Sequence, residues 1–141
     1  MSRKDAHLDH FAEIPMFSAC TRKELGLVGQ RAEKVTIPKG STVVHEGKTG
    51  REFFIIIEGT AKVTRNGRKV ASLTAGDHFG ELALFERVPR NASVTATSDL
   101  DVVLLDRREF SGLLNEVPTL AFKLLQGMAG RLREADRSSI N

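Results

Sequence analysis

The chain has 141 residues, of which 40% are hydrophobic, so it can bury the core that a single domain spanning residues 1–141 requires. Its 21 Lys and Arg residues exceed its 18 Asp and Glu residues by only three, and this dispersed excess argues against direct DNA binding. The polar first ten residues, the lack of an 18-residue apolar run and the single cysteine, Cys20, lead us to expect no secretory signal, no membrane contact and a reducing cytoplasm.

Two helices are expected in residues 1–32. The first carries three apolar residues at a spacing of three, which places them on one face, and a proline ends it. The second begins at a capping box, in which the side chains of Thr21 and Glu24 each accept a hydrogen bond from the other residue's backbone N–H. It then runs to about Ala32. The residues that define the first helix are Leu8, Phe11, Ile14 and Pro15.

Residues 33–106 are different in kind, because short β-rich runs alternate there with glycines. Asn66 and Gly67 give the clearest hairpin signal, since both residues tolerate the positive φ of a type I′ turn. Seven or eight short strands at this spacing predict a double-sheet sandwich or jelly roll. The expected strands are Lys34–Ile37, Thr42–His45, Glu52–Glu58, Ala61–Arg65, Lys69–Leu73, Ala92–Thr97 and Leu100–Leu105.

Residues 107–138 are expected to be helical again. A cap at Asp106 begins a helix that runs to about Asn115. Pro118 then suits the first position of a new helix. That last helix carries an apolar series at a spacing of four, formed by Leu120, Leu124, Met128 and Leu132, with Ala121 and Leu125 beside it.

The chemistry is concentrated in residues 79–94. Gly80 frees the backbone for a tight path, and Glu81–Glu86 can form one helical turn whose first N–H groups attract a small anion. Arg90 adds a guanidinium that can hold a phosphate through two parallel hydrogen bonds. The carboxylate of Glu81 repels phosphate but accepts hydrogen bonds from a hydroxyl. A ligand with both a phosphate and a free ribose hydroxyl satisfies both side chains.

This segment resembles the phosphate-binding cassette of cyclic nucleotide-binding domains, the family that includes the catabolite activator protein and the protein kinase A regulatory subunits. The resemblance rests on Phe-Gly-Glu-Leu-Ala-Leu at residues 79–84 and Pro-Arg-Asn-Ala-Ser-Val at residues 89–94. A glycine framework at Gly40, Gly47 and Gly59 supports it, and the likeness covers nearly the whole chain. It implies a mainly β fold with flanking helices, namely an eight-stranded double-sheet jelly roll with N-terminal helices and a C-terminal hinge and lid helix pair.

The resemblance also implies a role for each matching residue. Glu81 would accept a hydrogen bond from the ribose 2′-hydroxyl, Gly80 would approach the ribose with its backbone, and Arg90 would hold the exocyclic phosphate oxygens. Three kinds of group would complete the site: the backbone N–H groups of Ala83 and Ala92 at the phosphate, the apolar side chains of Leu82 and Val94 around sugar and base, and the last helix as a lid.

Asn91 stands where the family usually has Ser, Thr or Ala. In cGMP-selective members a Thr there reaches the guanine amino group, and the Asn91 amide oxygen can accept the same donor. We expect cAMP as the ligand, and cGMP stays open as an alternative. Asn91 could instead contact the phosphate or only stabilise a turn. Arg51 replaces a frequently acidic residue at a surface turn, where we expect no effect on binding.

We therefore expect a cyclic nucleotide sensor without catalytic activity, whose C-terminal helices move about a hinge at Glu116–Pro118 when ligand binds. It would act on an unknown effector protein. Gly127 and Gly130 would allow a second backbone to come close, which makes a homodimer through the last helix an expectation.

Other interpretations stay open. A transcription regulator would need a helix-turn-helix after the last helix, and none fits before Asn141. The chain could therefore be the regulatory part of a larger transcription regulator, channel or enzyme. It could also be a degenerate interaction domain, although Glu81 and Arg90 are intact. A metal-binding cupin is disfavoured because the four histidines lack metal-ligand spacing. No metal or cofactor is expected.

Overall fold

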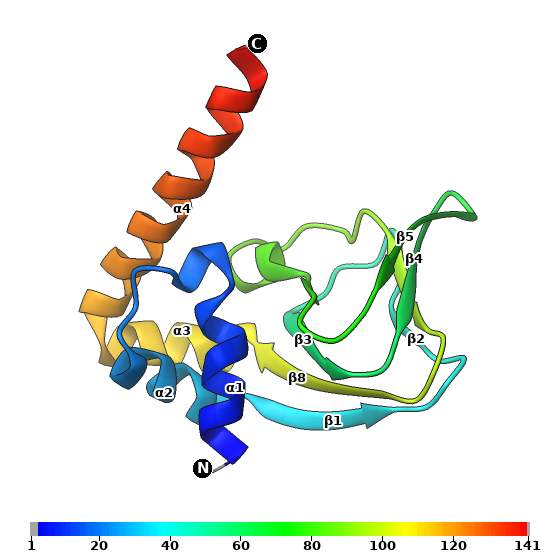
Figure 1. The fold of residues 1–141 in the computed structure, drawn as a ribbon, viewed down its shortest axis with the longest axis horizontal. Helices are drawn as coiled ribbons and strands as arrows, with labels where there is room; N and C mark the ends of the chain where they lie inside the picture. Colours follow the sequence, from blue (N-terminus) through cyan, green and yellow to red (C-terminus); the bar gives the residue numbers. More distant parts are fainter. Residues whose placement is uncertain (1–2, 141) are drawn as a thin grey trace. The chain divides into compact units, whose positions relative to one another are not determined.

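The computed structural model describes the backbone of residues 3–140 and the side chains of residues 8–130, 132 and 133. The chain forms two compact units, each of which is described by itself. One is a β unit of residues 32–110, and the other is a helical unit made of the described residues up to Arg31 and from Ser111 onward. Figure 1 shows both units along the chain.

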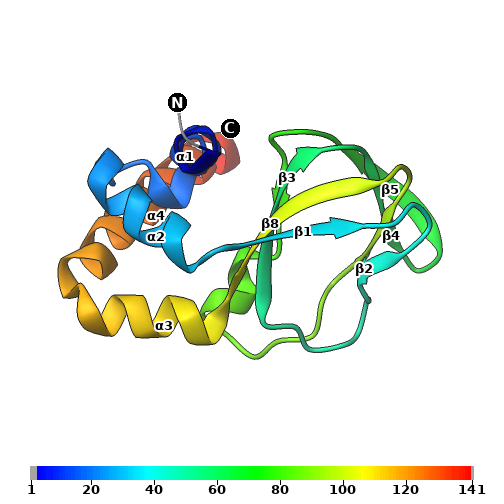
Figure 2. The same cartoon turned by 90° about the horizontal axis from the view of Figure 1, so that it is seen from below.

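The β unit confirms the expected mainly β architecture of two antiparallel four-stranded sheets. The first sheet has the strand order β1-β8-β3-β6 and the second β2-β7-β4-β5. Figure 2 shows β1 and β8 of the first sheet side by side. The strands are β1 (Glu33–Ile37), β2 (Thr42–Val44), β3 (Glu52–Glu58), β4 (Ala61–Arg65), β5 (Arg68–Leu73), β6 (His78–Phe79), β7 (Ser93–Ala96) and β8 (Leu100–Asp106).

A shared apolar core lies between the inward faces of the two sheets. In β3, Phe54 and Ile56 alternate inward, and Ile56 is completely buried. Val102 of β8 and Val94 of β7 meet them from the first and second sheets respectively. Burying such side chains stabilises the fold by about 1.5–3 kcal/mol each, so this core is what holds the sheets together.

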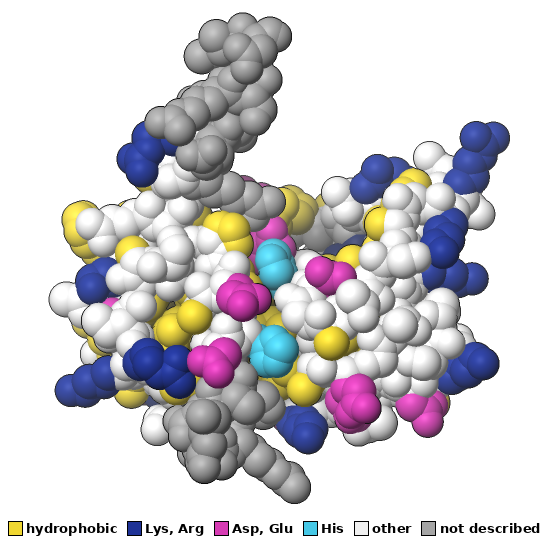
Figure 3. All heavy atoms as spheres, in the orientation of Figure 1, with side chains coloured by type: hydrophobic (Ala, Val, Ile, Leu, Met, Phe, Trp, Pro, Cys, Tyr) yellow, Lys and Arg dark blue, Asp and Glu magenta, His cyan; other side chains and the backbone are white. Residues whose placement is uncertain are grey.

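The Asn66-Gly67 turn between β4 and β5 is confirmed, with φ of 53° at Asn66 and 78° at Gly67. β5 is an edge strand, and five of its six residues are exposed. Lys and Arg side chains gather over this hairpin (Figure 3). Such charges discourage another chain from pairing with the free edge. The basic side chains are Lys62, Arg65, Arg68 and Lys69.

β6 was not predicted, because a strand of two residues is too short to show a pattern of alternation. It pairs His78 with Ile55 and Phe79 with Phe54, whose rings stack at 5.0 Å. β3 and β4 have the predicted bounds, and the boundaries of the other strands differ from the predicted ones by at most one residue. β6 matters because it delivers the chain directly into the cassette.

The N-terminal part of the helical unit holds three helices: α1 (Arg3–Ala12), the 3₁₀ helix η1 (Pro15–Phe17) and α2 (Arg22–Arg31). The capping box is confirmed, since the Thr21 N–H donates to Glu24 at 2.8 Å and the Glu24 N–H donates to Thr21 at 3.2 Å. The expectation that the first helix continues through Ile14 is wrong. α1 ends at Ala12, and Pro15 begins η1 instead, because proline suits the first position of a helix.

The C-terminal helices are α3 (Arg107–Glu116) and α4 (Pro118–Ile140). The Asp106 carboxylate accepts a hydrogen bond from the Arg108 N–H at 2.9 Å, which confirms the predicted cap. An ion pair joins Glu116 to Arg31 of α2. No helix in the described part of the chain is both long and apolar enough to cross a membrane.

The inner side of α4 is partly as predicted. Leu120 and Leu124 are buried, whereas Leu132 is 66% exposed and therefore does not continue the buried series. Leu125 and Phe122 are also exposed. Gly127 makes a close approach, but to the same chain, because a Cβ there would lie 2.6 Å from the carbonyl oxygens of Pro15 and Met16 in η1.

Cys20 is half-buried beside α2. Burial raises the pKa of its thiol to about 11, and the nearby Glu24 carboxylate acts in the same direction, against the opposing charge of Lys123. The thiol is therefore protonated at neutral pH and is a poor nucleophile.

Substituting Gly127→Ala should destabilise the helical unit by about 1–3 kcal/mol, because the added methyl group meets rigid backbone. Gly130→Ala is the matched control. The nearest atom to a Cβ there is a flexible Arg133 nitrogen at 3.8 Å, so this change should stabilise α4 by about 0.5–1 kcal/mol. Urea unfolding of both variants measures the difference, and equal effects would contradict the close approach at Gly127.

Candidate functional site

A cavity of about 310 Å³ opens in the β unit, a volume at the lower end for small-molecule sites. Its walls come mainly from β6, the 3₁₀ helix η2 (Glu81–Leu84) and the loop before β7, with contributions from β2, β4, β5 and β7. All eight predicted site residues line this cavity. They are Gly80, Glu81, Leu82, Ala83, Arg90, Asn91, Ala92 and Val94.

The guanidinium of Arg90 lies in a seat formed by two glycines. A Cβ at Gly50 would lie 2.2 Å from Arg90 Nε, and a Cβ at Gly80 would lie 2.5 Å from Arg90 Nη1. Gly80 also has a φ of 87°, a left-handed conformation that glycine adopts without strain. The sequence singled out Gly80 for its backbone freedom but missed Gly50, whose proximity to Arg90 depends on the packing of β3.

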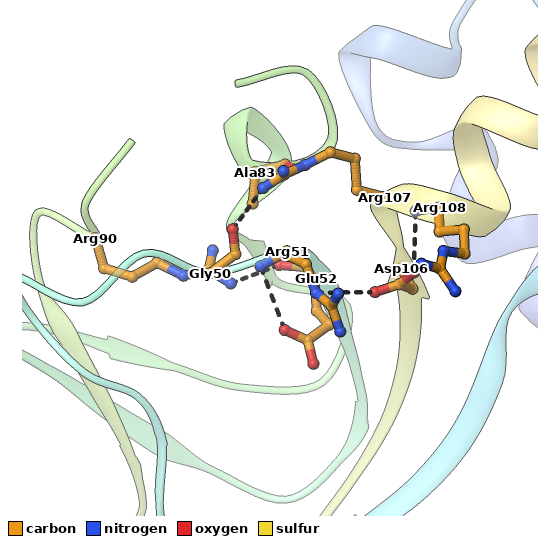
Figure 4. Close-up of polar contacts among 8 residues, drawn as sticks. All are labelled: Gly50, Arg51, Glu52, Ala83, Arg90, Asp106, Arg107 and Arg108. Carbon is orange, nitrogen blue, oxygen red and sulfur yellow. Dashed lines mark hydrogen bonds and ion pairs between the residues drawn. The ribbon is translucent and has the colours of Figure 1, made fainter. Parts of the chain in front are cut away.

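The hydrogen bonding of Arg90 is incomplete. Its Nη2 donates to the Glu52 carbonyl at 2.8 Å, as Figure 4 shows. Its Nε is fully buried and has no hydrogen-bond partner among the described residues. A buried donor without a partner is unusual in a folded protein, and at a cavity wall it points to a missing acceptor.

The charge of Arg90 is also poorly compensated. Burial lowers the pKa of its guanidinium, and the positive charge of Arg107 lowers it further, while the Glu52 carboxylate opposes both effects. The group nevertheless stays charged at neutral pH, because arginine is effectively never deprotonated in proteins. A partly buried cation in this state favours an anion beside it.

The backbone of Arg90 is held in place by the turn before β3. The Arg90 N–H donates to the Lys48 carbonyl at 2.9 Å, and the Arg90 carbonyl accepts from the Gly47 N–H at 2.8 Å. Thr49 and Pro89 form an isolated β-bridge in the same place. Arg90 is therefore positioned by its backbone as well as by its side chain.

Arg107, the first residue of α3, is a residue that the sequence did not reveal. Its Nε donates to the Ala83 carbonyl at 2.7 Å and its Nη2 to the Gly50 carbonyl at 2.8 Å. Figure 4 shows the side chains of Arg90 and Arg107 both reaching the short segment from Gly50 to Glu52. Arg107 thus ties η2, the Arg90 seat and the start of α3 together within the β unit.

Glu81 begins η2, so the predicted helical turn is confirmed, although it ends at Leu84 rather than at Glu86. The Glu81 carboxylate lies at the cavity wall, with its Oε2 3.7 Å from Nδ1 of His78. The Ala83 N–H donates to the Gly80 carbonyl at 3.1 Å, so it is already engaged within the turn.

The apolar part of the cavity is formed by buried Val94 and by Leu82, which is 59% exposed. Asn91 is exposed, and its backbone carbonyl accepts a hydrogen bond from Arg65 Nε at 2.9 Å. Arg65 was not predicted, because only strand pairing brings β4 beside this loop. The further lining residues, which were not among the predicted site residues, are Val44, Val63, Leu73, Phe79, Val88 and Pro89.

Arg51 lies outside this cavity, as expected. Its side chain is 65% exposed and lies 3.8 Å from Asp106. Among the described side chains, no group of three or more His, Cys, Asp or Glu residues is arranged to hold a metal ion.

A double-sheet β-roll that presents a cation, a carboxylate and apolar walls around one cavity defines a module that binds small anionic molecules. The sequence profile of the cyclic nucleotide-binding domain matches residues 34–117. The chain belongs to the cyclic nucleotide-binding domain family, as the cassette indicated.

Three similar proteins show the range of this likeness. The chain is 34% identical to the cAMP-dependent protein kinase regulatory subunit of Hypocrea atroviridis over 119 residues, which is 84% of this chain and 26% of the relative. The N-terminal domain of a transcriptional regulator from Streptomyces coelicolor A3(2) has a TM-score of 0.84 and 30% identity, covering 92% of this chain and 96% of that one. The structure of cAMP-bound PfPKA-R has a TM-score of 0.68 and 27% identity, covering 95% of this chain and 48% of that one. The chain spans about a quarter of the length of the kinase regulatory subunits that it matches.

Gly50→Ala should displace the Arg90 guanidinium, because the side-chain end can move more easily than the backbone. The lost hydrogen bond to Glu52 should lower the free energy of unfolding by about 1–2 kcal/mol. In an Arg90→Ala background the same substitution should cost almost nothing, and urea unfolding of the double-mutant cycle measures this difference. An equal cost in both backgrounds would show that Gly50 does not act through Arg90.

Proposed function

We propose that this chain binds a cyclic nucleotide, cAMP in the first place, and acts as a regulatory sensor without converting its ligand. The observation that carries the proposal is the partly buried guanidinium of Arg90 at the wall of a ligand-sized cavity, whose buried Nε has no hydrogen-bond partner in the described part of the chain. A cyclic phosphate supplies the missing acceptor and the missing negative charge. The relatives whose names include cAMP support this choice of ligand.

The other residues then take complementary roles. Glu81 accepts a hydrogen bond from the ribose 2′-hydroxyl, and Gly80 lets the ribose approach the backbone. Leu82 and Val94 contact the sugar and base. The N–H groups of Ala83 and Ala92 complete the phosphate site, which requires the Ala83 N–H to share or leave its bond to the Gly80 carbonyl.

We propose that Asn91 contributes to the choice between cAMP and cGMP. Its amide oxygen can accept a hydrogen bond from the guanine amino group, which adenine lacks at that position. Titration of the chain with both nucleotides, repeated with Asn91→Ala, tests this role. An unchanged ratio of the two affinities would remove Asn91 from base recognition.

We further propose that ligand binding changes the conformation of the C-terminal helices about a hinge at Glu116–Pro118, with the last helix closing over the base. Arg107 supports this route, because it joins the Ala83 carbonyl of the cassette to the first turn of α3. The required coupling between ligand and helices is about 1–3 kcal/mol.

The proposed sensor needs partners that respond to it. It acts on an effector protein or on further domains of a larger regulator, as the kinase subunit and transcriptional regulator among its relatives suggest. We also propose a homodimer through α4, whose exposed Phe122, Leu125 and Leu132 can pack against a second copy. Sedimentation of the chain with and without cAMP tests this, and a monomer at high concentration would argue against it.

Arg90→Ala should weaken cAMP binding by about tenfold or more, because a charge-assisted phosphate contact is lost. Arg51→Ala is the matched control, since it removes the same charge from an exposed position and should leave the affinity unchanged. Isothermal titration measures both. Wild-type affinity in the Arg90 variant would remove the assigned site, and equal losses in both variants would indicate only a general charge effect.

Saturating cAMP should change amide hydrogen exchange in the segment after Asp106, as the switch requires. Arg107→Ala should reduce this change in α3 even when the ligand is saturating, because the cassette is no longer tied to the helix. Mass spectrometry of exchanged peptides measures the effect. Unchanged exchange on ligand binding in the wild-type chain would leave a binding site without a switch.

A further inference from the structure

His78 lies on β6, immediately before the cassette. Its ring packs edge-on against Phe53 at 5.7 Å with an interplanar angle of 67°. Its side chain is 25% exposed, but its Nδ1 atom is fully buried and has no hydrogen-bond partner among the described residues. A buried ring nitrogen without a partner needs a physical explanation, because a buried polar atom that makes no hydrogen bond destabilises the fold.

The carboxylate of Glu81 lies close to this nitrogen. The distance from His78 Nδ1 to Glu81 Oε2 is 3.7 Å, which is too long for a hydrogen bond but close enough for a small side-chain rotation to form one. The left-handed backbone of Gly80 turns the chain between these two residues, so their side chains face each other. β6 pairing with β3 keeps the His78 backbone fixed.

A carboxylate has two oxygens and about four lone-pair directions, so one oxygen can accept from His78 while the other accepts from a ligand hydroxyl. A side chain held in this way loses less conformational freedom when the ligand binds. The Nδ1–H tautomer of His78 supplies the necessary donor.

We propose that His78 is a positioning residue for Glu81: its Nδ1–H closes onto one carboxylate oxygen and holds the other toward the ribose 2′-hydroxyl of the ligand. This inference rests on the proposed function. His78 would raise the affinity through Glu81, and therefore only for ligands that carry the 2′-hydroxyl.

The test compares cAMP with 2′-deoxy-cAMP by isothermal titration. His78→Phe keeps a ring against Phe53 but removes the nitrogen, and His78→Asn places an amide donor near the position of Nδ1. The wild-type chain should prefer cAMP, and His78→Phe should reduce this preference by about fivefold, with little change in the affinity for 2′-deoxy-cAMP. His78→Asn should restore much of the preference. Thermal unfolding confirms that each variant is folded.

The outcomes separate the two proposals. Equal weakening of both ligands in His78→Phe would mean that His78 acts only by packing, and an unchanged preference would equally overturn the positioning role. His78→Leu, which also lacks the polar atom, gives the same comparison if the phenylalanine variant does not fold. If the wild-type chain binds neither nucleotide, the proposed function fails and this inference fails with it. If it binds both but His78→Phe leaves their ratio intact, only the role of His78 is overturned.

Discussion

The arrangement of the site depends on one partly buried cation, the guanidinium of Arg90, whose N–H donors are not all matched by acceptors among the described residues. Arg90 donates to the Glu52 carbonyl, yet its buried Nε has no hydrogen-bond partner among the described residues. The Glu52 carboxylate offsets its positive charge only in part, because burial and the charge of Arg107 both act against the charged form. Such a group is costly unless an anion completes it. The fold keeps it there by providing space at Gly50 and Gly80, where any side chain would overlap the guanidinium.

The same contacts connect the site to the rest of the β unit. The turn at residues 47–49 holds the backbone of Arg90, and Arg107 bonds both to Gly50 beside Arg90 and to Ala83 in the cassette. Because Arg107 is also the first residue of α3, a shift of the cassette would change the hydrogen bonds at the start of that helix. These hydrogen bonds are the route by which the proposed switch would pass from the cassette to the start of α3.

Family membership identifies the chain as a cyclic nucleotide-binding domain, but it does not say which activity the domain regulates. The relatives include a kinase regulatory subunit and part of a transcriptional regulator, and this chain matches only a fraction of the kinase subunit. One binding module can serve several outputs, because the proposed ligand contacts all lie in the cavity of the β unit, whereas the response would depend on the elements joined to that unit. The proposed role of His78, which acts through Glu81, concerns ligand recognition and not the response.

Local chemistry determined much of this protein from sequence alone. Features that depend on residues a few positions apart were predictable, namely the capping box at Thr21, the type I′ turn at Asn66 and the helix start at Pro118. The short motif that contains Glu81 and Arg90 was predictable for the same reason. The tertiary structure alone decided which distant residues meet. Gly50 and Arg107 join the Arg90 seat, Arg65 reaches Asn91, and Gly127 faces η1 only because strands and helices far apart in sequence pack together. Sequence periodicity reports the local backbone conformation, whereas these contacts depend on strand pairing and helix packing, which no short segment encodes.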